Sequence, residues 1–135
     1  MKKSWIDKFN QPREKMIKVL DTNFADMKEG EAMLIATPRI IDEYINQVPK
    51  SYTVDVKTMR KDLALTHQAE VTCPVTTGIF LRIVAEVSYE KITQGEENPT
   101  PFWRVVDPQS KLANKLACGP SFIQEMRALE VAQAK

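Results

Sequence analysis

The sequence predicts a single, compact, mainly α-helical domain with one hydrophobic core. Its 135 residues are a common size for one domain. Hydrophobic residues make up 43% of the chain and charged residues 27%, as in globular proteins. Helix-start signals in which Thr or Asp precedes Pro, at Thr37-Pro38 and Asp107-Pro108, divide the chain. Apolar residues at three- and four-residue spacing follow both signals, which is typical of amphipathic helices.

The first 36 residues are expected to be a helical extension of this domain. Residues 12–20 suggest a helix with Met16, Val19 and Leu20 inward, followed by a loop and a short apolar run at 33–36. The chain begins Met-Lys-Lys but lacks the long apolar stretch of a secretory signal. It also lacks an apolar run near 18 residues, so we expect a cytoplasmic protein with no membrane partner.

The central core, residues 37–106, is predicted to begin with a helix that starts at Pro38 and ends before Pro49. The apolar stripe of this helix is Ile41, Tyr44, Ile45 and Val48. A short extended segment at 52–54 follows. Asp55 can then cap a second helix, with Val56, Met59 and Leu63 inward and Lys57, Arg60 and Lys61 on its outer face.

A third helix of the core is predicted to start at Pro74. The residues that we expect to face inward are Val75, Ile79, Phe80, Ile83 and Val87. Thr76, Thr77 and Arg82 then face elsewhere. The helix is predicted to end before the polar, proline-rich loop 94–101.

The C-terminal part combines a short apolar segment with two predicted helices. Residues 102–106, which are apolar and aromatic, are expected to be extended. The helix that opens at Asp107-Pro108 carries Leu112 and Leu116, and Gly119 can terminate it. Ser121 is expected to cap a last helix. Residues 107–135 are therefore predicted to be helices that pack on the core of the same single domain.

The residue inventory argues against most enzyme classes. Two cysteines cannot form a disulfide framework, and a single histidine cannot supply paired zinc ligands, so we expect no metal site. The glycine-rich loops that bind nucleotides are absent, and no cofactor or catalytic residue is predicted. A thiol centre that pairs Cys73 with His67 across a turn is one alternative. The other is that Cys73 opens a helix and Cys118 packs as a small apolar residue.

The charges are balanced in sum but uneven along the chain. The net charge is +1, yet residues 1–20 and 50–61 are rich in lysine and arginine, whereas 86–97 is acidic. One face could thus attract phosphate, although ordinary solvated surfaces explain the same pattern. The cationic helix at 55–64 and the helix at 74–88 form a helix-turn-helix pair, which serves either DNA binding or simple core packing.

The order of several motifs resembles the DNA-binding domain of the O6-alkylguanine-DNA alkyltransferases (methylated-DNA–protein-cysteine methyltransferases). Thr37-Pro38, Val48-Pro49-Lys50-Ser51 and the ending Asp62-Leu63-Ala64 follow the family's sequence of helix starts and ends. The stretch 76–82 is similar to its recognition helix in the glycine, the apolar positions and the arginine. Pro101-Phe102-Trp103-Arg104-Val105 looks like its active-site signature, Pro-Cys-His-Arg-Val.

The likeness is greatest to the alkyltransferase-like proteins, which lack the acceptor cysteine and carry Pro-Trp-His-Arg-Val at this signature. It implies a winged helix-turn-helix-like core at 37–106. Phe102 takes the position of the nucleophilic cysteine, so alkyl transfer, and with it enzyme activity, is not expected. Trp103 takes the position of the histidine, and the nucleotide-rotating tyrosine falls near Val56. No arginine stands near 73–75, where the family inserts one into the base stack.

The leading hypothesis is a non-enzymatic protein that binds double-stranded DNA and senses alkylated or otherwise damaged DNA in repair. The residues predicted to contact DNA are Lys57, Arg60, Lys61, Thr76, Thr77, Gly78 and Arg82. The residues predicted to form a pocket are Val56, Pro101, Phe102, Trp103 and Arg104, of which Trp103 is expected to belong to the core and Arg104 to bond backbone carbonyls. The alternative is a module that kept the fold, lost DNA binding and contacts a protein partner.

Overall fold

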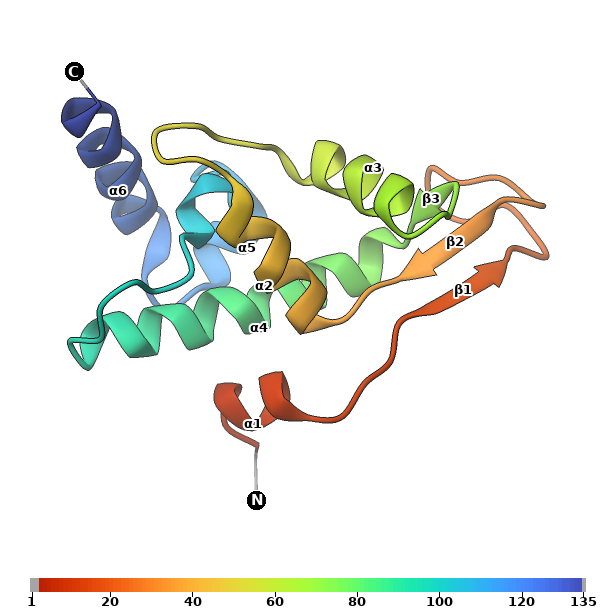
Figure 1. The fold of residues 1–135 in the computed structure, drawn as a ribbon, viewed down its shortest axis with the longest axis horizontal. Coiled ribbons are helices and arrows are strands. Elements are labelled where there is room, and N and C mark those ends of the chain that lie inside the picture. The colour runs from red at the N-terminus through yellow and green to blue at the C-terminus, as the bar shows by residue number, and fades with distance from the viewer. Residues whose placement is uncertain (1–2, 135) are drawn as a thin grey trace.

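A computed structural model describes residues 3–134, which form six α-helices, one short 3-10 helix and a three-stranded sheet. The mainly α-helical class is confirmed (Figure 1). The N-terminal and sheet elements are α1 (Trp5–Asn10), β1 (Met16–Val19), β2 (Ala32–Ile35) and β3 (Val71–Thr72). The remaining elements are α2 (Pro38–Gln47), α3 (Val56–Thr66), α4 (Pro74–Thr93), η1 (Phe102–Arg104), α5 (Lys111–Lys115) and α6 (Gly119–Gln133).

The helix α4 is the centre of the domain. It runs along the molecule, with α2 crossing it on one side and α1 lying on another (Figure 1). Its middle is buried on nearly every side, and Leu81, Val84 and Ala85 are each 1% exposed. Although α4 has 20 residues, no helix within 3–134 combines the length and apolarity needed to cross a membrane.

The starts of α2 and α3 agree with the predicted caps. Thr37 Oγ1 accepts a hydrogen bond from Ile40 N at 3.2 Å, and Pro38 opens α2. Asp55 Oδ1 accepts one from Thr58 N at 2.7 Å at the start of α3. Each cap satisfies a backbone donor that the first helical turn leaves free.

The sheet is the main departure from the predicted N-terminal helices. β1 pairs antiparallel with β2, from Met16 opposite Ile35 to Val19 opposite Ala32, and β2 pairs parallel with β3. The prediction of a helix at 12–20 is therefore wrong, as is that of a wholly helical extension. Pairing with the apolar strand β2 satisfies the backbone of these residues, and such tertiary contacts override a weak local helix preference.

Three local predictions near the C-terminus also need correction. Residues 102–104 form the 3-10 turn η1 instead of an extended segment, closed by bonds from Arg104 N to Pro101 O and from Val105 N to Phe102 O. Ser110, and not Asp107, caps α5 through Ala113 N. Gly119 has a positive φ of 72° but is the first residue of α6, which starts before the predicted cap Ser121.

A buried ion pair joins the end of α2, η1 and α6. Arg104 Nε and Nη2 donate to the two carboxylate oxygens of Glu130 at 3.0 and 2.7 Å, and Arg104 Nη1 donates to Val48 O at 2.7 Å. Burial raises the pKa of Glu130, but the Arg104 guanidinium and Ser51 N outweigh this and hold it below its ordinary value. Arg104 thus binds a backbone carbonyl, as its planar fork favours.

Replacing Arg104 with Met should lower the free energy of unfolding at pH 7 by about 3–5 kcal/mol, because Glu130 would stay buried without its partner. The pKa of Glu130 is depressed in the folded chain, so the pair stabilises above the unfolded pKa and this stabilisation is lost as the pH falls through the lower folded value. Urea denaturation at pH 7 and at pH 3 measures the difference, which should shrink at pH 3. The exposed control Lys91→Met should change stability by less than about 0.5 kcal/mol. An equal loss at both pH values would contradict this role for Glu130.

Candidate nucleic-acid interface

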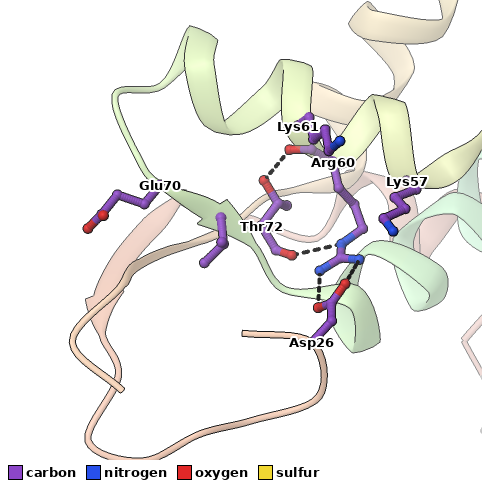
Figure 2. Close-up of a pocket in the computed structure, with 7 residues that line it drawn as sticks. Asp26, Lys57, Arg60, Lys61, Glu70 and Thr72 are labelled. Carbon is purple, nitrogen blue, oxygen red and sulfur yellow. Dashed lines mark hydrogen bonds and ion pairs between the residues drawn. The ribbon is translucent and has the colours of Figure 1, made fainter. Parts of the chain in front are cut away.

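Three of the residues predicted to contact DNA lie together on α3. Lys57, Arg60 and Lys61 line a pocket of about 280 Å³ whose opposite wall includes Asp26 and Thr72 (Figure 2). Asp26 comes from the long β1–β2 connection, and Thr72 belongs to β3. Lys57 and Lys61 are exposed, as predicted for the outer face of this helix.

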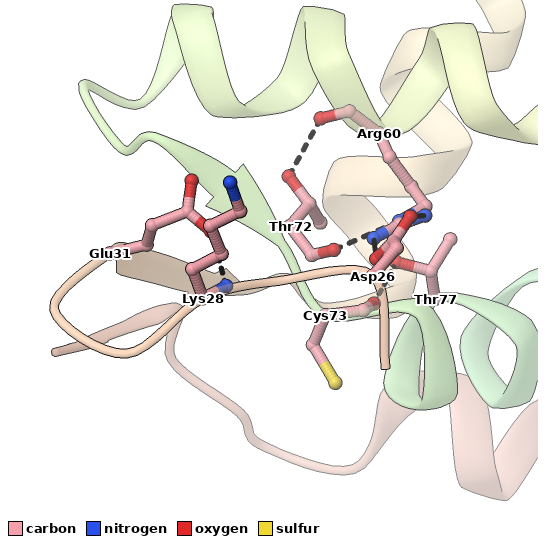
Figure 3. A network of polar contacts seen from close by, with 7 residues as sticks. All are labelled: Asp26, Lys28, Glu31, Arg60, Thr72, Cys73 and Thr77. Carbon is pink, nitrogen blue, oxygen red and sulfur yellow. Dashed lines mark hydrogen bonds and ion pairs between the residues drawn. The ribbon is translucent and has the colours of Figure 1, made fainter. Parts of the chain in front are cut away.

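Arg60 differs from its two lysine neighbours because its guanidinium is already bonded. Nη1 and Nη2 donate to the two oxygens of Asp26 at 2.9 and 2.8 Å, and Nε donates to Thr72 O at 2.9 Å (Figure 3). Its side chain is only 13% exposed. The hydrogen bonds from Arg60 lower the pKa of Asp26, which keeps that carboxylate ionised. The prediction that Arg60 shares the exposed outer face with Lys57 and Lys61 is therefore wrong.

The predicted recognition residues of α4 separate into one buried residue and three that reach the surface. Thr77 is fully buried, and its Oγ1 donates to Cys73 O at 2.6 Å, so the prediction that it contacts DNA is wrong. The hydroxyl is used within the first turn of α4, where such back-bonding to the preceding turn is common. Thr76, Gly78 and Arg82 are half-buried. A Cβ added to Gly78 would meet no atom within 4 Å, so the backbone there faces open space.

The surface of α4 also carries two residues that were expected in the core. Val75 and Ile79 are each 54% exposed, so their predicted inward position is wrong. The N-terminal half of the helix is buried on most of its circumference, and residues three and four positions apart reach the surface on one side. We call the surface made by Val75, Gly78, Ile79 and Arg82 the α4 outer face.

Cations from distant parts of the chain surround the α4 outer face. Two shallow hollows on this surface, of about 310 and 390 Å³, are lined by α4 residues together with Lys3, Lys8, Arg13 and Lys115. None of the lining residues is a carboxylate. The basic composition of residues 1–20 was the signal for three of these cations, but only the fold places them beside α4.

Aromatic rings hold several of these cations in place. Lys8 Nζ lies 4.4 Å from the centre of the Trp5 ring, and the Arg82 guanidinium lies 5.1 Å from the same ring. The Arg13 guanidinium lies 4.9 Å from the Phe80 ring. Contacts of this kind favour a cation without neutralising its charge. Arg82 also pairs with the buried carboxylate of Glu86 at 3.7 Å, so the positive charge of this surface comes mainly from the other four cations.

The predicted pocket is only partly assembled. Pro101, Trp103 and Arg104 line a groove of about 670 Å³ beside α6. Phe102 does not line this groove, because it is fully buried in the main core, and Val56 packs against that core from α3. The phenyl ring of Phe102 is 5.5 Å from the Trp103 ring and 6.1 Å from that of Phe122, so apolar packing fixes its place.

Trp103 is a core residue, as expected. Its side chain is 4% exposed, and its carbonyl accepts a hydrogen bond from Arg127 Nε at 2.6 Å. The indole Nε1 is buried and has no hydrogen-bond partner. It lies near the Glu130 carboxylate and helps to lower the pKa of that group. The Trp103 ring is therefore not exposed for a flipped base to stack on.

The alternative thiol centre is not assembled. Cys73 is buried in a small cluster with Leu20, Met27 and Met33. His67 instead has its Nδ1 3.0 Å from Lys15 Nζ. Burial raises the pKa of Cys118, which disfavours a reactive thiolate. Within residues 3–134, no three His, Cys, Asp or Glu side chains gather as ligands for a metal ion.

Trp103→Ala should lower the free energy of unfolding by about 3–5 kcal/mol, because a large buried side chain would be replaced by a cavity. The control Leu129→Ala removes a side chain that lines the same groove but is 49% exposed, and it should cost less than about 1 kcal/mol. Chemical denaturation of both variants measures the difference. Similar small losses in the two variants would show that Trp103 is not a core residue.

No protein-family model, curated protein or solved structure matches this chain. The interpretation of its function therefore depends on its own residues: two cationic surfaces, one around the α4 outer face and one on α3, and a buried aromatic turn at 102–104.

Proposed function

We propose that this protein binds double-stranded DNA without acting as an enzyme, and that α4 is its recognition helix. The observation that supports this most directly is the α4 outer face, where five cations and no carboxylate line the hollows around exposed apolar side chains, and where only Arg82 pairs with a carboxylate, that of the buried Glu86. The five cations are Lys3, Lys8, Arg13, Arg82 and Lys115. Cations of this number bind phosphates and release counterions from DNA, which provides affinity independent of sequence.

The apolar part of the surface suits the base edges of a major groove. An α-helix fits that groove, and apolar side chains such as Val75 and Ile79 can contact the methyl groups of thymine. Gly78 lies between them and has open space where a side chain would be, so the α4 backbone can approach the DNA closely. In this proposal, Arg82 and the cations beside it hold the phosphates of the two strands.

The order of the elements supports the finer proposal of a winged helix-turn-helix-like core. α3 precedes α4, and the connection between them includes only the two-residue strand β3. The β1–β2 hairpin pairs with β3 at the N-terminal end of α4 and projects from the body of the molecule (Figure 1). We assign the role of the wing to this hairpin, although it comes before the two helices in the sequence.

The proposed function is recognition of DNA without a chemical reaction on it. Phe102, at the position that the resemblance assigns to the acceptor cysteine, has no nucleophilic atom and lies in the core. Sensing of alkylated DNA would then depend on the shape and charge of the duplex at the α4 outer face.

Ile79→Glu should weaken binding of duplex DNA by at least about tenfold, because a carboxylate would face phosphates and base edges at the centre of the proposed interface. Stability should change little, since Ile79 is 54% exposed. Fluorescence anisotropy with a labelled duplex, measured across a salt series, gives affinity and the number of phosphate contacts. The matched control Val131→Glu changes an exposed apolar residue of α6 that is 49% exposed.

Equal affinity of the Ile79→Glu and Val131→Glu proteins would move the interface away from α4. Absence of salt-dependent duplex binding by the unmodified protein would sink the proposal and favour the protein-partner alternative.

Incubation with a duplex that carries a radiolabelled O6-alkylguanine should leave no label on the protein, because no thiol stands at residue 102. Denaturing electrophoresis followed by autoradiography detects covalent transfer. Label mapped to Cys73 or Cys118 by peptide digestion would reverse this expectation and revive the thiol-enzyme alternative.

A further inference from the structure

In the pocket on α3, the Arg60 guanidinium is oriented to bind an anion, and the Asp26 carboxylate is the anion that it binds in this structure. Arg60 is oriented by Thr72, whose carbonyl accepts from Nε and whose Oγ1 donates to Arg60 O at 2.7 Å. The two remaining donors of the fork bind the two oxygens of Asp26. A phosphate group offers the same planar fork two oxygens in a similar arrangement.

The charges around this pair exceed what Asp26 neutralises. Lys57 lies beside the Arg60–Asp26 pair, Lys61 lies one turn further along α3, and neither forms an ion pair among the described residues (Figure 2). The other carboxylate of the pocket wall, Glu70, accepts a hydrogen bond from Ala32 N at 3.0 Å. The pocket lining thus holds three cations and two carboxylates, Asp26 and Glu70, which leaves an excess of one positive charge.

Asp26 reaches Arg60 from a tight turn in the β1–β2 connection, which two backbone hydrogen bonds between Phe24 and Met27 close. Met27 is 2% exposed and fixes the loop in the small cluster around Cys73. Ala25 adopts a φ of +54°, which is unfavourable for a residue with a Cβ. The Asp26 side chain is 52% exposed, so water can solvate its carboxylate when it leaves the guanidinium. The Asp26 carboxylate can therefore leave the guanidinium without loss of core packing.

We propose that the Lys57–Arg60–Lys61 pocket is a phosphate-binding site that Asp26 occupies in the free chain and that a backbone phosphate of DNA takes over on binding. This inference rests on the proposed function for the identity of the ligand. The wall of the pocket, β3, leads through Cys73 into α4, so the site lies at the N-terminal end of the proposed recognition helix. Asp26 then acts as an internal competitor that lowers the affinity for DNA.

Asp26→Asn tests the pocket without DNA. The change keeps the size of the side chain and removes the competing charge. Titration with inorganic phosphate, followed through the Arg60 Nε–Hε resonance in NMR spectra, should show binding about tenfold tighter than in the unmodified protein. Asp21→Asn is the matched control: it makes the same charge change in the same loop at an exposed residue, and it should behave like the unmodified protein. Equal phosphate affinity of the two variants would overturn the proposal.

A second experiment, with duplex DNA, tests whether the phosphate that binds in this pocket belongs to the DNA backbone. Asp26→Asn should also bind duplex DNA more tightly than Asp21→Asn, with a salt slope steeper by about 0.9 for one additional phosphate contact. Adding Lys57→Gln and Lys61→Gln to Asp26→Asn should remove this gain. Tighter binding of inorganic phosphate without tighter binding of DNA, in a protein that does bind duplex, would overturn DNA as the ligand.

The two experiments also separate this inference from the proposed function. If no variant binds duplex DNA, the proposed function fails. The phosphate titration then still decides whether the pocket is an anion site. If the unmodified protein binds duplex DNA and the Asp26→Asn and Asp21→Asn proteins bind it equally well, only the further inference fails.

Discussion

The burial of α4 is the constraint on which the rest of the structure depends. A 20-residue helix packed by α1, α2 and η1 has most of its circumference in the core. Hydrophobic burial of this extent is the main stabilising contribution in a domain of this size, and in the N-terminal half of α4 it leaves one narrow surface in solvent. The α4 outer face is that surface. Its position follows from how the core is packed, because α1 and α5 bring the N-terminal cations and Lys115 beside it.

Burial also determines what each arginine can do. Arg104 and Arg60 both form bidentate pairs with carboxylates, at distances between 2.7 and 3.0 Å. The partner of Arg104 is 7% exposed and joins elements of the core, so this pair has a structural role. The partner of Arg60 is 52% exposed and belongs to a loop, so this pair can exchange with solvent anions. The same arginine–carboxylate pairing is therefore structural at Arg104 and exchangeable at Arg60.

Local signals in the sequence predicted much of the fold but little of the site. The caps Thr37 and Asp55 act through neighbouring residues, so α2 and α3 could be placed from sequence alone. The strand β1 could not, since its pairing with β2 depends on residues far along the chain. The inward face of α4 was misjudged for a similar reason. A helix buried on most sides carries no clear apolar stripe, and the exposed positions Val75 and Ile79 are as apolar as the buried ones.

The distribution of charge in space could not be predicted from the sequence either. A net charge of +1 hides a separation in space that only the fold creates. On the α4 outer face, cations gather with no carboxylate among the lining residues. On α3, Asp26 meets Arg60 across 34 residues of sequence. The first surface is always available to a polyanion, whereas the second becomes available only when the Asp26 carboxylate leaves Arg60. If DNA binds both, the first surface determines whether the duplex associates, and the loop that carries Asp26 adjusts how tightly it is held.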